Sequence, residues 1–286
     1  MLQLRNPKKS NTMTKKKDRT IPWGAYKLSL LLRMFLIIKY IGLSRGCLRH
    51  KILEFISYHH KQAFVDYKRY GLKFRLSIRN NNTDAKILTT SKSYEKEELD
   101  YLYKYCKGNH FIDIGANTGF YSLSLGAVSN SSKILSIEPN PNTSEILEFN
   151  ILSNDLTSRI KVEKCGIGDK KESTFYSSGD LGSVSILKIN DQQNESFKMS
   201  TMPLLEIINR NKITNIDAIK IDIEGMECSA LVPFFKNSKT ELFPKCIILE
   251  HNHDEFWEED LISILSDVGY TIKHKNRSNY ILALIN

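Results

Sequence analysis

The cysteines of this chain do not form the patterns that disulfide frameworks or zinc sites require. They are odd in number and widely spaced, and no two form a Cys-x-x-Cys pair. A disulfide-stabilised secreted domain is therefore a poor fit, and a reducing, cytoplasmic environment is favoured. We expect no zinc site. The cysteines are Cys47, Cys106, Cys165, Cys228 and Cys246.

A membrane-spanning segment is also missing. The most apolar stretch runs from Tyr26 to Leu43 and is interrupted by Lys27, Arg33 and Lys39. Its uncharged runs are far shorter than the roughly 20 residues that a spanning helix needs. A secretory signal is disfavoured because the run contains an arginine and no small-residue cleavage site follows it. Two interpretations remain: a helix packed on the catalytic domain, or an amphipathic helix lying on a membrane surface.

The positive net charge of the chain comes from its first 80 residues. Residues 1–80 contain 19 Lys and Arg against 3 Asp and Glu, a net of +16, whereas residues 81–286 contain 22 against 29, a net of −7. A nucleic-acid enzyme usually carries a basic face on the fold itself, so we expect no nucleic-acid partner. The lysine-rich residues 1–20 predict a disordered tail. Peripheral contact with an anionic membrane through residues 1–45 is a further expectation.

The most informative stretch runs from His110 to Pro139. An apolar strand, Phe111 to Ile114, leads into a turn with glycines at 115 and 119, then a helix and a second strand that ends on Glu138. Glycines allow the backbone to approach a ligand closely, and an acid after the second strand can accept hydrogen bonds from ribose hydroxyls. This pattern predicts a site for a nucleoside.

Strands and helices alternate through the rest of the chain and end in a hairpin at residues 270–284. With 286 residues and 41% hydrophobic content, they predict one α/β core with a doubly wound, mostly parallel sheet and an antiparallel terminal strand. We expect three parts: a tail at 1–20, a helical and β lead-in at 21–85, and the catalytic domain at 86–286. An inserted β pair is expected at residues 172–177 and 183–189.

Acidic side chains at the carboxyl ends of later strands are the candidates for chemistry. Asp222 lies near the end of the apolar strand AIKIDI, Glu224 comes directly after it, and His251 follows CIILE. Ligands of such sheets bind beyond these strand ends. A carboxylate there can act as a general base toward a hydroxyl, bind an oxygen-preferring divalent ion, or cap the following helix. The sequence leaves these roles open.

Taken in order, these motifs resemble the FkbM family of S-adenosylmethionine-dependent methyltransferases. FIDIGANTGFYSL, LSIEPNP, CGIGDKKESTFY, IDAIKIDIEGME and IILEHN are each similar to a family motif, and IKIDIEGME is the most specific. The resemblance covers about two thirds of the chain. It implies a class I methyltransferase fold and methyl transfer to an oxygen, typically a hydroxyl of a glycan, lipid-linked sugar or polyketide.

The resemblance also implies roles for individual residues. The acceptor would meet the methyl group at Asp222 and Glu224, with His251 as a further catalytic candidate. Residues that the resemblance places at S-adenosylmethionine are Asp113, Gly115, Ala116, Asn117, Thr118, Gly119, Glu138, Asn140, Cys165 and Gly166.

Two rival enzyme classes are less consistent with the motifs. An NAD-dependent oxidoreductase requires GxGxxG, and here only Gly115 and Gly119 are present in the turn. A nucleic-acid methyltransferase would need an Asn-Pro-Pro-Tyr-like element or a Pro-Cys nucleophile, and neither occurs. A non-enzymatic scaffold at the membrane is a third alternative, and the intact Asp113, Glu138 and Asp222 argue against it.

Overall fold

The computed structural model of the chain describes residues 21–41, 46–91, 94–128, 132–169, 171–177, 180, 182, 184–187 and 195–285. The predicted tail at residues 1–20 lies outside this part of the chain, as does some of the strand predicted at 183–189. None of the helices described is long and apolar enough to span a membrane.

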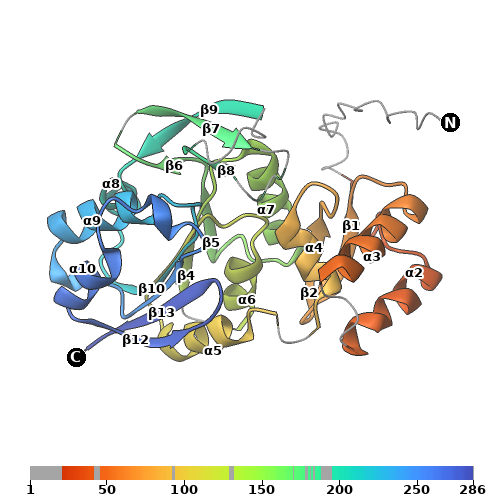
Figure 1. Cartoon of the computed structure of the whole chain (residues 1–286), viewed down its shortest axis with the longest axis horizontal. Coiled ribbons are helices and arrows are strands. Elements are labelled where there is room, and N and C mark those ends of the chain that lie inside the picture. The colour runs from red at the N-terminus through yellow and green to blue at the C-terminus, as the bar shows by residue number, and fades with distance from the viewer. Residues whose placement is uncertain are drawn as a thin grey trace.

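A seven-stranded sheet forms the centre of the molecule (Figure 1). From one edge to the other its strands are β12 (Tyr270–Lys275), β13 (Asn279–Leu284), β11 (Cys246–Glu250), β10 (Ile216–Ile221), β3 (His110–Ile114), β4 (Lys133–Ile137) and β5 (Ile160–Glu163). The last five run parallel to one another, and β13 is antiparallel to both of its neighbours. This topology confirms the predicted α/β class.

Helices cover both faces of the sheet, which explains why its inner strands are buried along almost their whole length and consist mainly of apolar residues. Residues of β3 alternate between two cores, with Phe111 in one and Ile112 in the other, as the two-residue period of a strand requires. The first core is covered by α5 (Lys96–Tyr105), α6 (Phe120–Val128) and α7 (Pro141–Ser153), and the second by α8 (Leu204–Arg210), α9 (Glu227–Asn237) and α10 (Leu261–Asp267). Two short 3₁₀ helices flank β11: η2 (Thr240–Leu242) precedes it and η3 (Asp254–Phe256) follows it.

A four-stranded sheet is inserted after β5. Its order is β6 (Gly166–Ile167), β9 (Glu195–Met202), β7 (Glu172–Ser177) and β8 (Val184–Ser185). The sequence predicts residues 183–189 as the main partner of 172–177, but β7 pairs along its whole length with β9, and β8 adds only two residues. Phe175 and Phe197 stack across β7 and β9 at 5.7 Å, which favours this register.

The N-terminal region packs on the catalytic fold at the opposite end from α10 (Figure 1). Its elements are α2 (Leu30–Phe35), η1 (Leu36–Ile41), α3 (Gly46–His59), β1 (Val65–Arg69), β2 (Leu72–Leu76) and α4 (Asn82–Thr89). The proposed boundary between residues 85 and 86 falls inside α4. Side chains from both sides of it, such as Ile56 and Phe111, belong to one hydrophobic core.

One buried ion pair connects separate segments of the N-terminal region to one another. The Arg75 guanidinium donates from Nε to Asp66 Oδ1 at 2.9 Å and from Nη2 to Oδ2 at 3.0 Å, and both side chains are fully buried. Arg75 also donates to the carbonyls of Ile21 and Pro22. The pair therefore joins the β1–β2 hairpin to the chain segment that leads into α2.

Arg75→Leu is expected to destabilise the protein by about 3–5 kcal/mol, because it leaves Asp66 as a buried charge without its partner. Urea unfolding measures the change. The matched control is Lys96→Ala, which breaks the exposed pair between Lys96 and Asp100 and should cost about 0.5 kcal/mol or less. Equal losses for the two variants would contradict this account.

Candidate active site

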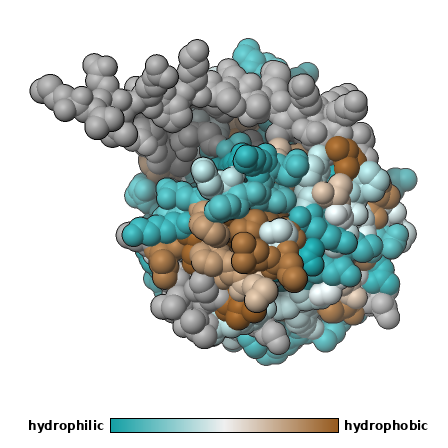
Figure 2. All heavy atoms as spheres, turned by 90° about the vertical axis from the view of Figure 1, so that its right-hand side faces the viewer, coloured by the Kyte–Doolittle hydropathy of each residue, from teal (hydrophilic) through white to brown (hydrophobic). Residues whose placement is uncertain are grey.

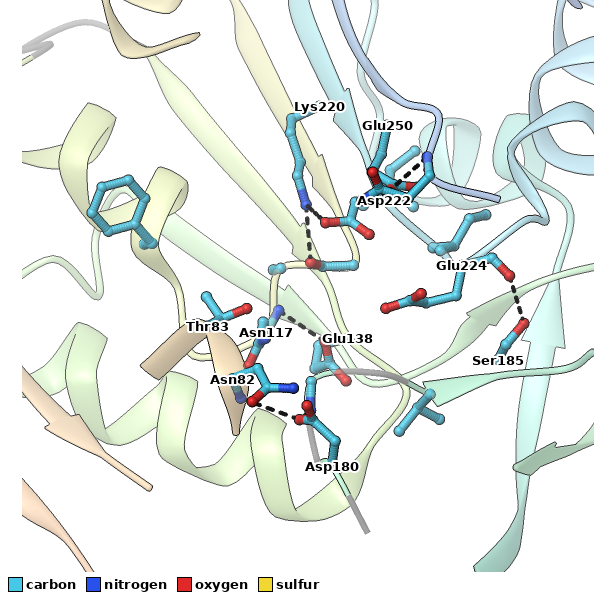
Figure 3. Close-up of a pocket in the computed structure, with 18 of the residues that line it drawn as sticks. Asn82, Thr83, Asn117, Glu138, Asp180, Ser185, Lys220, Asp222, Glu224 and Glu250 are labelled. Carbon is cyan, nitrogen blue, oxygen red and sulfur yellow. Dashed lines mark hydrogen bonds and ion pairs between the residues drawn. The ribbon is translucent and has the colours of Figure 1, made fainter. Parts of the chain in front are cut away.

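A cavity of about 500 Å³ opens at the carboxyl ends of β3, β4, β10 and β11. This is within the range of roughly 300–1,000 Å³ that is typical of small-molecule sites. The catalytic fold supplies most of its lining, and Figure 3 shows the polar side chains that converge there. Helices α3 and α4 also line it, through Arg49, His50 and Leu53 and through Asn82 and Lys86. The N-terminal region is therefore part of the site.

The turn after β3 lies against the end of β10. Gly115 has a φ of +73°, and a Cβ added there would lie 1.9 Å from the carbonyl oxygen of Asp222. Only glycine fits this contact. Asn117 follows with a φ of +51°, a conformation that asparagine tolerates better than most residues. Gly115, Ala116 and Asn117 expose this turn to the cavity.

Glu138, at the end of β4, closes the turn from the other side. Its Oε2 accepts the Asn117 N–H and its Oε1 accepts the Asn140 N–H, both at 2.9 Å. Burial raises the pKa of this carboxyl to about 7, although the two N–H groups oppose the shift. Each oxygen keeps one lone pair, so Glu138 can accept two further hydrogen bonds from a ligand.

Cys165 and Gly166 line the cavity just beyond the end of β5. A Cβ on Gly166 would lie 2.3 Å from the Phe175 ring, so glycine allows the inserted sheet to pack closely here. Burial raises the pKa of the Cys165 thiol to about 11, which makes it a poor nucleophile at neutral pH.

Four of the residues expected at the cofactor are not among those lining the cavity: Asp113, Thr118, Gly119 and Asn140. Each supports the turn or its flanking helices. Asp113 is fully buried and accepts from the Ser122 N–H and hydroxyl, and the Thr118 hydroxyl donates to Asp84. Asn140 is the N-cap of α7, where its side chain accepts from the Asn142 N–H.

Asp222 is held by a buried lysine. Lys220 Nζ lies 3.2 Å from Asp222 Oδ2 and 3.4 Å from the Gly115 carbonyl (Figure 3). Burial alone would lower the pKa of Lys220, but Asp222 and Asp113 outweigh it and keep the pKa above its ordinary value. The lysine is therefore charged, and it orients a carboxylate that is itself partly exposed to the cavity.

Glu224 and His253 form a second polar pair in the cavity. Glu224 Oε2 lies 3.0 Å from His253 Nε2. Glu224 has a φ of +55°, a strained conformation for a residue with a side chain, and its carbonyl accepts from the Ser185 hydroxyl at 3.0 Å. This conformation turns the chain from β10 into α9.

The structure does not bring His251 into the cavity. Its ring packs on Tyr280 at 4.5 Å, and its Nε2 lies 3.3 Å from the Asn276 carbonyl. His253, two residues later, lines the cavity instead. The sequence indicates His251 as the catalytic candidate, but a turn follows β11 and ends the strand periodicity, so His253 is the histidine that faces the cavity.

Glu250 is a further cavity residue at a strand end. It ends β11, and its Oε1 accepts the Asn252 N–H at 3.0 Å. Its Oε2 is buried and has no hydrogen-bond partner within the described chain. Burial, with the charges of Asp222, Glu227 and Glu224, raises the pKa of Glu250 to about 9. It is a neutral acid at pH 7 and can donate a hydrogen bond.

A metal centre has no support in this geometry. Within the residues that the structure describes, no group of three or more His, Cys, Asp or Glu side chains is arranged to hold a metal ion.

Together, the strand order, the glycine turn against β10 and the acid at the end of β4 define a class I S-adenosylmethionine-dependent methyltransferase. The model of the methyltransferase FkbM domain matches residues 113–272, and the chain belongs to that family. Its methyl donor is S-adenosylmethionine.

Individual relatives are more distant. The methyltransferase sdnD of Sordaria araneosa is 31% identical over 101 residues, which are 30% of this chain and 39% of that protein. Among solved structures, the human methyltransferase 10 domain containing protein gives a TM-score of 0.45 at 16% identity, over 76% of this chain and 89% of the other. M. jannaschii TYW2, solved in complex with AdoMet, gives 0.40 at 12% identity, over 77% and 84%.

Gly115→Ala is expected to destabilise the protein by at least about 2 kcal/mol, because the new methyl group would overlap the Asp222 carbonyl. S-adenosylmethionine binding should be lost with it. Gly71→Ala is the control: Gly71 has a φ of +82° but no atom within 4 Å of an added Cβ, so it should cost only about 1 kcal/mol. Similar melting temperatures for the two variants would contradict the contact.

Proposed function

We propose that this chain transfers the methyl group of S-adenosylmethionine to a hydroxyl oxygen of a glycan, a lipid-linked sugar or a polyketide-like small molecule. The observation that supports this most directly is the contact between Gly115 and Asp222. It joins a nucleoside-type cradle to a group of carboxylates within one cavity. Peripheral membrane contact through residues 1–45 belongs to the same proposal.

The cofactor cradle fits S-adenosylmethionine by the chemistry of its donors. Glu138 would accept hydrogen bonds from the two ribose hydroxyls through the lone pairs that Asn117 and Asn140 leave free. The turn at Gly115 to Asn117 would lie beside the methionine end, and Cys165 and Gly166 beside the adenine. Asp113, Thr118, Gly119 and Asn140 would act by holding this turn in shape.

The carboxyl groups of the cavity and His253 would align the acceptor and take its proton. When bound, S-adenosylmethionine would supply an electrophilic methyl group on its sulfonium sulfur for in-line transfer to the acceptor oxygen, with the neutral thioether as the leaving group. Asp222, oriented by Lys220, would align the acceptor hydroxyl. Glu224 would take the hydroxyl proton, and His253 at 3.0 Å would share it. Glu250, as a neutral acid, would donate to a second acceptor oxygen.

The rival classes are weakened to different degrees. Membership of the FkbM family excludes an NAD-dependent oxidoreductase. A nucleic-acid acceptor is disfavoured by the net charge of −7 over residues 81–286, and the absence of a nucleic-acid partner stays a prediction. Calorimetry with NAD and with a duplex oligonucleotide should show no binding to either, while S-adenosylmethionine binds.

Glu138→Gln is expected to weaken S-adenosylmethionine binding on the order of ten- to a hundredfold, the value of one or two charged hydrogen bonds. Wild-type affinity should fall as the pH is lowered through about 7, because protonation of Glu138 removes the acceptor. Calorimetry across this range should show a flat profile for the variant. The control, Glu148→Gln, removes an exposed carboxylate of α7 that pairs with Lys164.

Asp84 also has a pKa that burial raises to about 7, but it bonds Thr118 behind the turn. A pH dependence that persists in Glu138→Gln would assign the effect to Asp84 and contradict the role of Glu138.

Asp222→Asn and Glu224→Gln are expected to lower methyl transfer at least about a hundredfold, the usual contribution of a general base or of alignment. Release of S-adenosylhomocysteine with a panel of glycan and polyketide hydroxyl acceptors measures the rate. Binding of S-adenosylmethionine should be largely retained. Glu255→Gln, a partly exposed carboxylate 3.5 Å from the other side of His253, should leave the rate near wild type. Full activity in both site variants would refute the assignment.

A further inference from the structure

The N-terminal helices expose an unusual amount of apolar surface. Leu30 and Leu31 are 74% and 71% exposed. Figure 2 views this end of the molecule and shows an apolar area bordered by hydrophilic residues. We call this area the apolar face; its residues are Leu30, Leu31, Met34, Ile37, Tyr40, Leu48, Phe55 and Tyr58.

Helix α2 has apolar side chains on its inner and its outer side, and Arg33 is its one charged residue. Leu32 of α2 and Leu36 at the start of η1 are buried in the first core, while Leu30, Leu31 and Met34 face outward. A surface helix of a globular protein normally carries polar residues on its outer side, and a helix that is apolar all round is covered by something. Contact between the Phe35 and Phe55 rings, 4.7 Å apart, joins α2 to α3. The exposed apolar residues of α2 and α3 therefore lie on neighbouring helices.

A second cavity, of about 440 Å³, lies beside the apolar face, and Ile37 and Tyr40 line both. Three cations border this cavity: Lys27, Arg33 and Lys68. The ammonium groups of Lys27 and Lys68 lie 5.5 and 5.8 Å from the centre of the Trp23 ring. Asp66, the acid that lines the same cavity, is neutralised by Arg75. The cavity is thus aromatic and positively charged.

We propose that the apolar face docks on an anionic lipid bilayer and that the second cavity receives a headgroup phosphate. Apolar side chains bordered by cations are what a peripheral protein needs to enter the headgroup boundary of such a membrane. Residues 21–61 contain seven Lys and Arg and a single acid, Glu54. A second copy would bring the same cations together, and like charges oppose that contact.

Docking in this way also places the catalytic cavity beside the lipid surface. Helix α3 contributes Phe55 and Tyr58 to the apolar face and Arg49, His50 and Leu53 to the lining of the catalytic cavity. One helix thus connects the membrane contact with the site. The inference itself does not depend on methyl transfer.

Flotation of the full-length chain with vesicles tests the proposal. The protein should float with phosphatidylcholine–phosphatidylglycerol vesicles and much less with phosphatidylcholine alone. The triple variant L30Q/L31Q/M34Q should reduce partitioning at least about tenfold. K27Q/K68Q should reduce partitioning onto anionic vesicles about fivefold for each lysine, because one charge near the membrane surface contributes roughly 1 kcal/mol. The preference for anionic over neutral vesicles should decrease accordingly.

Matched controls have the same chemistry elsewhere on the surface. V128Q/L152Q/I272Q removes three exposed apolar side chains outside the apolar face, and K239Q/K273Q removes two exposed lysines. Both should float like the wild type. Inorganic phosphate should compete only weakly, because the apolar face supplies most of the binding.

Three results would overturn the inference. The wild type could fail to float on anionic vesicles, the controls could lose as much binding as the test variants, or light scattering could show a dimer that L30Q/L31Q/M34Q dissociates while no vesicle binding occurs. Calorimetry with S-adenosylmethionine on the same preparations keeps the membrane inference separate from methyl transfer. Normal cofactor binding without flotation contradicts the membrane contact, including the part stated with the proposed function, and leaves methyl transfer standing. Flotation without cofactor binding contradicts methyl transfer and leaves the membrane inference standing.

Discussion

The contact between Gly115 and Asp222 is the constraint on which the site depends. The Asp222 N–H donates to the Ile114 carbonyl at 3.1 Å, and the absence of a side chain at Gly115 lets the turn after β3 lie directly on the end of β10. The turn at Gly115 and the segment at Asp222 form the two halves of the cavity and are about a hundred residues apart in the sequence. This contact fixes them against each other at van der Waals distance. The Lys220 ammonium bonds both halves, through the Gly115 carbonyl and the Asp222 carboxylate. Any movement of one half must disturb the other.

Burial then sets the charge of the cavity. It raises the pKa of Glu138 to about 7 and that of Glu250 to about 9, so the cavity holds fewer full negative charges at neutral pH than its carboxyl groups suggest. Lys220 compensates part of the remainder. Asp222 and Glu224 still leave an acidic environment that favours a positive ligand, and a sulfonium has that charge. A protonated Glu250 beside ionised neighbours supplies both a donor and acceptors, which suits an acceptor with several hydroxyl groups.

The parts of the fold that follow from local pattern could be predicted from the sequence. The run from His110 to Pro139 has uninterrupted apolar strands and a glycine turn, and the terminal hairpin has a polar turn between alternating strands; both are present as expected. Helix α4 could not be predicted, because NTDAKILT is short and its helical face is set by packing on β2. The long strand β9 is polar on its outer side, and its order depends on pairing with β7 and β6. The position of His253 depends on a turn geometry, and the raised pKa of Glu250 depends on burial that distant segments create.

The apolar stretch near the N-terminus shows why the sequence leaves two interpretations open. Packing and membrane contact predict the same composition, and only the direction of each side chain separates them. Both directions carry apolar side chains here, because Leu32 of α2 and Leu36 of η1 point into the core while Leu31 and Met34 point out. The inward side chains satisfy the requirement for packing. The outward side chains pack on nothing in the described part of the chain, and a group of exposed apolar residues of this kind is typical of an interaction surface. The surrounding cations make an anionic lipid surface the best match for its partner.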